Sequence, residues 1–144
     1  MVRPVRPKPA ASLVITKQKK NDLYVLMGQR PKKSRFAPNV WVFPGGRVEK
    51  SDMLNKSIKL SKKNLDDLSK LKSTKTLSIG LISAAIRETE EETNLKLIDK
   101  NLINLWVLAR AITPANQKIR FDTKFFVLDE KNFSNKIIGN GELN

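Results

Sequence analysis

Residues 87–95 read Arg-Glu-Thr-Glu-Glu-Glu-Thr-Asn-Leu, and residues 43–46, far upstream of them, read Phe-Pro-Gly-Gly. On a helix, side chains three and four positions apart share a face, so Glu88, Glu91 and Glu92 would form one acidic cluster. The two stretches together predict a helix with concentrated negative charge and, before it, a strand that ends in Pro-Gly-Gly and belongs to the same site.

The acidic cluster is chemically suited to a divalent cation. Three convergent carboxylates, with no sulfur or imidazole near them, form the hard, oxygen-rich environment that Mg²⁺ or Mn²⁺ prefers. Arg87 can reach Glu91 one helical turn later, but one arginine cannot neutralise the whole group. A solvated acidic helix face is the alternative for such a charge run. The upstream glycines, which let a backbone come close to a metal or a phosphate, favour the metal site.

The chain contains no cysteine and no histidine. This excludes zinc sites built from Cys and His, Cys nucleophiles and Ser-His-Asp triads, and it leaves carboxylates, Lys, Arg, Tyr or a hard metal for catalysis. There is no disulfide framework, no apolar run long enough to span a membrane and no signal-peptide pattern. We therefore expect a cytoplasmic protein that does not act at a membrane.

The 144 residues carry a formal charge of +14, from 28 Lys and Arg against 14 Asp and Glu. Such a charge attracts polyanions of any kind. The lysines are dispersed, however, and no basic block alternates with aromatic residues as a single-strand binding face would require. We do not expect nucleic-acid binding as the main function, although a basic nucleic-acid-binding domain remains an alternative.

The hydrophobic pattern predicts a single domain over residues 10–144, preceded by a mobile basic tail over residues 1–9. Residues 50–76 are rich in Lys, Ser, Asn and Leu, and we interpret them as a surface insertion with one short docked helix. A second helix is expected between Ser78 and Asn94, which would act as its caps. The expected strands are residues 11–17 and 23–29, joined as a hairpin, followed by 40–43, 102–112 and 119–128.

The two quoted stretches resemble the signature of the Nudix hydrolases, which is Gly, five residues, Glu, seven residues, then Arg-Glu-aliphatic-x-Glu-Glu-x-Gly-aliphatic. Gly46 begins the first half and Arg87 the second. Asp52 stands at the place of the first Glu, and 34 residues instead of seven separate it from Arg87. Thr89 replaces the aliphatic residue, and Asn94 replaces the glycine, whose left-handed backbone it can also adopt.

A signature interrupted in this way resembles the branch of the family that contains the coenzyme A diphosphatases, as do residues 30–38 and 120–126. The resemblance covers most of residues 10–128. It implies an α/β (α+β) fold, an α/β/α sandwich with a mixed β-sheet. Because only residues 129–144 follow the last expected strand, we expect the C-terminal helix of that sandwich to be missing from this chain.

The resemblance implies a metal-dependent hydrolase of the diphosphate bond in a nucleoside diphosphate linked to another moiety, with coenzyme A or acyl-CoA as the branch-level substrate. Its partner would be a small-molecule diphosphate, and its cofactor Mg²⁺ or Mn²⁺. A catalytically inactive Nudix domain that binds a nucleotide or a protein is the alternative. The metal ligands implied are Glu88, Glu91, Glu92 and the carbonyl of Gly45.

Three further residue roles follow from the resemblance. Glu88 is the candidate general base, and Arg87 would orient the glutamates, because a guanidinium can grip a carboxylate through two parallel bonds. Arg30 and Arg35 lie in the loop before the strand that ends in Pro-Gly-Gly and are candidates for binding substrate phosphates, with ordinary solvated arginines as the alternative.

Overall fold

A mixed β-sheet forms the centre of the computed structural model, which describes residues 3–101 and 103–142. Its strands are β1 (Lys8–Lys19), β2 (Asp22–Val25), β5 (Gly45–Arg47), β7 (Trp106–Ile112) and β8 (Phe121–Asp129). The order is β2-β1-β8-β7, with β5 paired to the first half of β1 and β2 to its second half. Only β1 and β8 run parallel, and the other pairs are antiparallel.

The expected hairpin is confirmed as β1 and β2, but the predicted strand over residues 23–29 is divided. Its end forms β3 (Gly28–Gln29), which pairs with β4 (Trp41–Val42) in a small separate sheet. The strand expected over residues 40–43 runs into Pro-Gly-Gly, but the structure divides this stretch: β4 ends at Val42, and the two glycines begin a separate strand, β5. Gly45 and Gly46 have no side chains, and this lets them pair with β1 in a crowded place.

The long helix α3 (Lys75–Thr93) carries the acidic residues. It begins after Thr74, whose hydroxyl accepts a hydrogen bond from the Leu77 amide at 3.1 Å. The prediction that Ser78 caps the helix is wrong: Ser78 lies inside the first turn and its hydroxyl bonds that of Ser73 at 2.8 Å. The predicted end is confirmed, since Asn94 has a left-handed φ of 69°.

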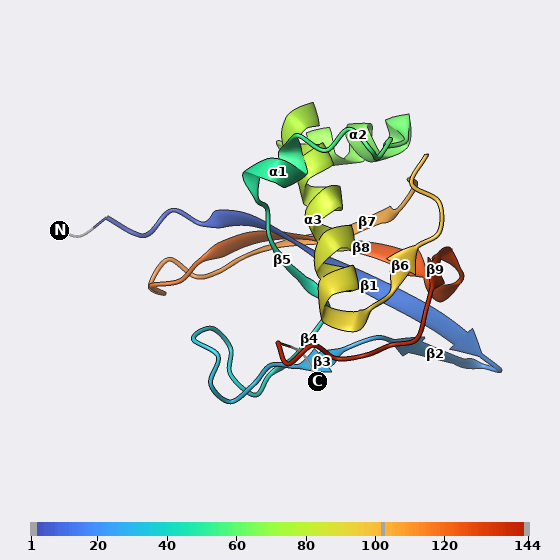
Figure 1. Ribbon diagram of the computed structural model, residues 1–144. Helices are drawn as coiled ribbons and strands as arrows, with labels where there is room; N and C mark the ends of the chain where they lie inside the picture. Colours follow the sequence, from blue (N-terminus) through green and yellow to red (C-terminus); the bar gives the residue numbers. More distant parts are fainter. Residues whose placement is uncertain (1–2, 102, 143–144) are drawn as a thin grey trace.

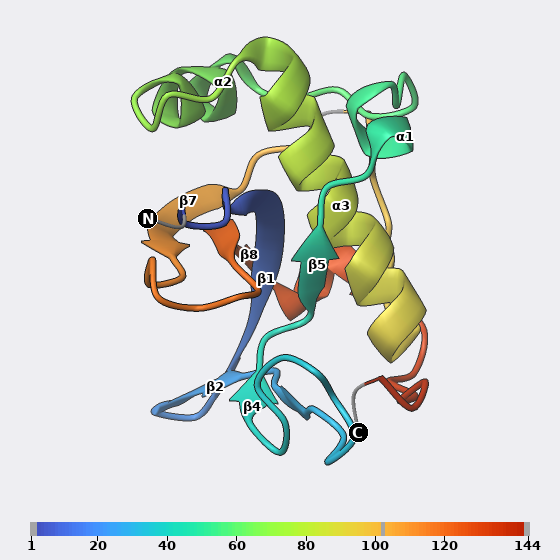
Figure 2. The same cartoon turned by 90° about the vertical axis from the view of Figure 1, so that its left-hand side faces the viewer.

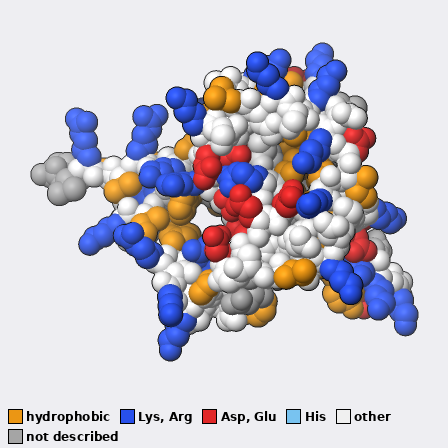
Figure 3. Space-filling model, in the orientation of Figure 1, with side chains coloured by type: hydrophobic (Ala, Val, Ile, Leu, Met, Phe, Trp, Pro, Cys, Tyr) orange, Lys and Arg blue, Asp and Glu red, His pale blue; other side chains and the backbone are white. Residues whose placement is uncertain are grey.

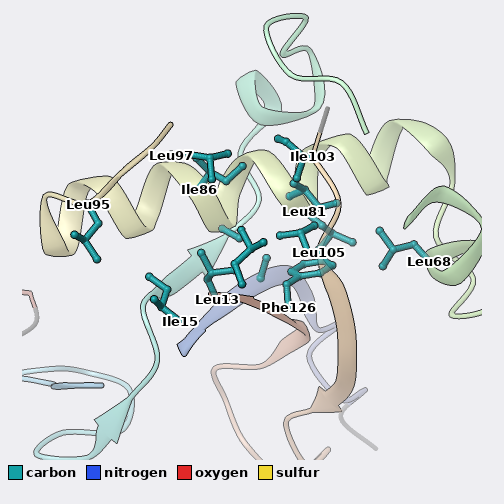
Figure 4. Packing of buried hydrophobic residues seen from close by; sticks show 14 residues of the cluster. Leu13, Ile15, Leu68, Leu81, Ile86, Leu95, Leu97, Ile103, Leu105 and Phe126 are labelled. Atoms are coloured by element: carbon teal, nitrogen blue, oxygen red, sulfur yellow. The ribbon is translucent and has the colours of Figure 1, made fainter. Parts of the chain in front are cut away.

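The core lies between α3 and one face of the sheet (Figures 1 and 2). Figure 4 shows Ile86 of α3 beside Leu97, and Leu13 of β1 beside Phe126 of β8. Leu13, Leu81 and Phe126 are fully buried. Burial of this apolar stripe fixes α3 over the sheet, so that its last two turns, which carry the glutamates, lie beside β5.

The segment over residues 50–76 forms two short helices, α1 (Lys50–Met53) and α2 (Lys62–Ser69), which pack near the first half of α3. The predicted docked helix corresponds to α2. Leu68 belongs to the core and Asn64 is fully buried, with its side-chain amide bonded to both backbone groups of Leu105 at 2.6 and 2.9 Å. The segment lies at the surface, but the buried contacts of Leu68 and Asn64 attach it to the core.

The remaining elements are short. The strand β6 (Lys96–Leu97) pairs with β9 (Phe133–Ser134), which follows the 3-10 helix η1 (Glu130–Asn132). Lys8 and Pro9, placed in the tail by the sequence, already belong to β1, and the mobility of the tail remains a prediction. The start of the expected strand over residues 102–112 lies outside the described residues, and β7 begins at Trp106.

Of the expected sandwich, residues 3–101 and 103–142 form the mixed sheet and the helical layer of α1, α2 and α3. The missing C-terminal helix remains a prediction. Among the described helices, none combines the length and the apolar character needed to span a membrane.

Candidate active site

Two glutamates of α3 lie one turn apart at the edge of β5. Glu92 is only 5% exposed, and the side chain of Glu88 is 14% exposed. One carboxylate oxygen from each, together with one from the exposed Glu142, lies within 4.8 Å of the others. Three carboxylates this close repel one another strongly unless a proton or a cation lies between them.

Burial changes the acidity of this pair. The pKa of Glu92 is raised to about 9, first because the carboxyl is buried and then because Glu88 is its hydrogen-bond partner and carries a like charge. Burial also raises the pKa of Glu88, although hydrogen bonds from Glu92 and Arg87 oppose that change. Without a metal, the pair therefore retains a proton near neutral pH, and a divalent cation could take the place of that proton.

The glycines of β5 allow the close approach between the strand and the glutamates. A Cβ atom on Gly46 would lie 2.6 Å from the Cδ atom of Glu88. A Cβ on Gly45 would collide with the backbone of β1 at Ala11 and Ser12. Any larger residue would force the strand away from β1 or push Glu88 aside. Gly45 lies with Glu92 on the wall of one cavity, which places its backbone near the glutamates.

Arg87 donates hydrogen bonds to two carboxylates, Asp52 of α1 and Glu88 of its own helix. Its Nε and Nη2 atoms each donate to one oxygen of Asp52 at 2.9 Å, and its Nη1 atom donates to Oε1 of Glu88 at 2.8 Å. The bonds to Asp52 are the largest reason why the pKa of Arg87 lies above its ordinary value. Arg87 is thus fixed in direction and in turn fixes Glu88.

The side chain of Glu91 points in a different direction from those of Glu88 and Glu92. Its side chain is 52% exposed and accepts two long hydrogen bonds from Nη1 of Arg87, at 3.3 and 3.4 Å. It lines a cavity of about 620 Å³ with Arg87 and Asp52, and this cavity shares no lining residue with the one that Gly45 and Glu92 line. The structure therefore brings Glu88 and Glu92 together but does not place Glu91 in the same group of carboxylates.

Arg30 reaches the site and Arg35 lies further out. Arg30 lines the same cavity of about 190 Å³ as Glu92 and Gly45, and its Nε atom donates to the carbonyl of Phe36 at 2.8 Å. Arg35 is exposed and lines a neighbouring cavity. In Figure 3, Asp and Glu side chains gather in the middle of one face, beside a hollow and surrounded by Lys and Arg.

Three site features were not assigned from the sequence. The first is the contact between Asp52 and Arg87: the signature marks Asp52, but the contact depends on how the segment between the two residues folds. Glu142 lies 50 positions after Glu92 without a local pattern to mark it. Phe121 lines the cavity because its strand turns that face toward the site, and it stacks edge-on against Phe36 with ring centres 5.2 Å apart.

Comparisons with known proteins bear on the fold. No family model matches the chain. The chain is 32% identical over 99 residues to the acyl-coenzyme A diphosphatase NUDT19 of Xenopus laevis, a match that covers 54% of this chain and only 26% of that protein. The chain thus corresponds to about a quarter of the length of this curated relative.

Solved structures of several Nudix proteins have the same fold. A Nudix hydrolase from Alicyclobacillus acidocaldarius superposes with a TM-score of 0.71 and 22% identity, over 96% of this chain and 77% of that one. The Ap4A hydrolase of C. elegans, in a binary complex, gives a TM-score of 0.57 and 19% identity, over 95% and 75% of the two chains. The chain therefore has the Nudix fold.

Proposed function

We propose that this Nudix-fold chain is a metal-dependent hydrolase of the diphosphate bond in a nucleoside diphosphate linked to another moiety. The observation that carries the proposal is the buried pair Glu88 and Glu92, held between Arg87 and the glycines of β5. A diphosphate is densely anionic, so its hydrolysis requires cations that neutralise it and a group that accepts the proton of water. Both requirements can be met within this site.

The donor set fits Mg²⁺ or Mn²⁺. Oxygens bound to one Mg²⁺ lie within about 4.2 Å of one another, because each bond is about 2.1 Å long. The grouping of Glu88, Glu92 and Glu142 within 4.8 Å needs little adjustment to reach that spacing. We propose Glu88 and Glu92 as the central ligands, with the carbonyl of Gly45 and, after release from Arg87, Glu91 as further ligands. The bound metal would polarise the phosphates and lower the pKa of a bound water.

The protein's own groups have distinct proposed roles. Glu88, with one oxygen held by Arg87, would accept the proton of the attacking water on its other oxygen. Arg87 would act as a positioning residue, because its donors are occupied by carboxylates and the Arg47 carbonyl. Arg30, which faces the same cavity as Glu92, would bind a phosphate oxygen of the substrate. Arg35 would contribute positive charge at the outer end of the loop.

We propose coenzyme A or an acyl derivative as the substrate. The support is the similarity to a protein named as an acyl-coenzyme A diphosphatase, together with the loop over residues 30–38 that reaches the glutamates. The alternative, a Nudix domain that binds a nucleotide without hydrolysing it, predicts binding of the same ligands with no products.

The test is an assay of the purified chain with coenzyme A, ADP-ribose and diadenosine tetraphosphate, each with Mg²⁺ or Mn²⁺, followed by chromatographic separation of the products. We expect cleavage of coenzyme A only when the metal is present, and loss of cleavage in Glu92→Gln. The matched control is Glu90→Gln on the same helix, which removes an exposed charge paired only distantly with Lys96, at 3.8 Å. Binding of all three compounds without cleavage of any would support the inactive alternative instead.

A further inference from the structure

A second, strongly basic cleft lies next to the glutamate cavity. It has a volume of about 560 Å³, and seven of its eleven described lining residues are Lys or Arg, while none is Asp or Glu. In the whole chain, Lys and Arg account for 28 of 144 residues, so the cleft concentrates positive charge well beyond the average. Four segments supply these cations: the start of β1 and the residues before it, the loop before β4, the end of β5, and the turn between β7 and β8.

The cations of this cleft are not neutralised by the protein. Within the described part of the chain, none of the seven takes part in an ion pair with Asp or Glu. Like charges gathered in a concave surface produce a strong positive potential and favour a bound anion. By contrast, Arg110 on the neighbouring strand is fully paired with Asp122 at 2.8 and 2.9 Å. Among the described residues, the cations of the cleft therefore lack acidic partners, whereas an arginine outside the cleft has one.

Parts of the cleft are held in place by hydrogen bonds to the backbone. Nε of Arg120 donates to the carbonyl of Thr113 at 3.0 Å, and its Nη1 atom donates to the carbonyl of Val5. The amide of Lys8 donates to the carbonyl of Arg120 at 3.1 Å. These bonds tie the approach to β1 to the turn between β7 and β8. The cleft is therefore a built surface, and it leaves the side chains of Arg6, Lys8 and Lys118 available to a ligand.

The cleft is continuous with the proposed catalytic cavity. Arg30, Phe36, Arg47 and Phe121 line both spaces. The edge-to-face pair Phe36 and Phe121 therefore stands at the boundary, with the glutamates on one side and the basic residues on the other. One ligand that places its diphosphate near Glu92 can extend past the two rings into the cleft. The volume suits a group of nucleotide size rather than a long polymer.

We infer that this basic cleft binds an additional phosphate monoester of the same substrate molecule, separate from the diphosphate that is cleaved. The inference rests on the proposed function, and it narrows the substrate class to nucleoside diphosphate derivatives that carry one more phosphate outside the scissile diphosphate. The extra phosphate would bind the cations before and at the start of β1 and those of the turn between β7 and β8. Substrates without this phosphate would lack these contacts and bind less tightly.

The test compares substrates that differ only in one phosphate: coenzyme A with its 3′-dephospho form, and ADP-ribose 2′-phosphate with ADP-ribose. The double variant Arg6→Gln/Lys118→Gln removes two exposed cations whose side chains make no ion pair within the described residues. We expect its kcat/KM to fall about tenfold for the substrates with the extra phosphate, and less than twofold for their partners. The control Lys19→Gln/Lys56→Gln, which removes two exposed lysines elsewhere, should leave both values unchanged. Equal losses for both members of each pair would overturn the inference.

A binding measurement separates this inference from the proposed hydrolysis. Calorimetry with adenosine 3′,5′-bisphosphate and with AMP, neither of which contains a cleavable diphosphate, should show tighter binding of the bisphosphate by the unaltered chain. The double variant should lose that difference. If nothing is hydrolysed but the difference is present and depends on these cations, the cleft assignment stands and the hydrolase assignment fails. If the two nucleotides bind alike, or if only a single-stranded RNA binds through these residues, the inference is wrong.

Discussion

Asp52 and Arg87, 35 positions apart, form a two-bond ion pair in which both N···O distances are 2.9 Å. The side chain of Asp52 is 5% exposed and that of Arg87 is 25% exposed, so the pair lies largely away from water. Asp52 also accepts a hydrogen bond from the Glu49 amide at 2.8 Å, which fixes the first turn of α1. The long segment between the two halves of the signature therefore leaves intact the contact that orients Arg87.

Changing Asp52 to Asn should lower both stability and activity. The variant keeps the volume but replaces a charged acceptor, so the free energy of unfolding should fall by about 1–3 kcal/mol in urea denaturation. The control is Asp67→Asn, which breaks the exposed pair with Lys63 at 3.2 Å and should cost less than about 0.5 kcal/mol. Equal stability of the two variants would show that the ion pair does not hold α1 against α3.

The glutamates should differ in their contribution to metal binding. Glu88→Gln and Glu92→Gln should each lower kcat/KM by at least about 100-fold, because each would remove a charge that stabilises the metal. We expect Mn²⁺ to raise the melting temperature of the unaltered chain, and both variants should abolish that rise. Glu90→Gln is the control on the same helix and should behave like the unaltered chain.

Glu91→Gln then distinguishes the two possible roles of that residue. If Glu91 leaves Arg87 to bind the metal, its variant should lose activity and the effect of Mn²⁺ to the same extent as Glu92→Gln. If it only pairs with Arg87, the effect of Mn²⁺ should persist.

The metal-free protein should become less stable as the pH rises. Glu92 has an ordinary pKa of 4.5, raised to about 9 in the fold. The folded state thus binds the proton more tightly than the unfolded state, and this contribution to stability is complete below the ordinary pKa and is lost as the pH rises toward 9. The melting temperature without metal should therefore fall between these two pH values. Glu92→Gln should flatten this dependence, whereas Glu90→Gln should keep it. A flat profile of the unaltered chain would contradict the burial of an ionisable Glu92.

Residues with a strong local signal were placed correctly from the sequence. The helix expected between Ser78 and Asn94 corresponds to most of α3, and Asn94 marks its end, because the left-handed residue that follows a helix depends only on local geometry. The start of α3 was misplaced because Thr74 and Ser78 are both good capping residues, and only the tertiary structure decides between them.

Contacts between distant residues could not be predicted in the same way. Nothing near Glu142 indicates that it lies beside Glu88 and Glu92, since the contact depends on the path of the chain after β8. The orientation of Glu91 could not be predicted either. Helical spacing alone would place it with Glu88 and Glu92, whereas in the structure its carboxylate accepts hydrogen bonds from Arg87.

The two glycines of β5 should give different effects when each is changed to Ala. In Gly46→Ala the new Cβ would lie 2.6 Å from the end of the Glu88 side chain, which can move, so activity should fall far more than the melting temperature. In Gly45→Ala it would meet the backbone of β1, which cannot move without breaking the strand pair, so the melting temperature should fall sharply. Differential scanning fluorimetry and the hydrolysis assay together give both values, and the reverse ranking would contradict the arrangement of β5.

The segment over residues 50–76 should be partly dispensable, and its two helices should differ in importance. A linker that replaces residues 56–72 must run from Asn55, bonded to Ser83 at 3.3 Å, to Ser73, two residues before α3. The start of α3 at Lys75 lies eight residues before Ser83. That distance is about 12 Å along the helix, which about six Gly/Ser residues can span. This deletion removes Leu68 and the bonds from Asn64, so it should lower stability by about 2–5 kcal/mol while α3 and activity persist.

A linker that replaces all of residues 50–76 also removes Asp52 and should abolish activity even where circular dichroism shows that the sheet and α3 are retained. Full activity of this longer deletion would show that Arg87 does not need its partner in α1.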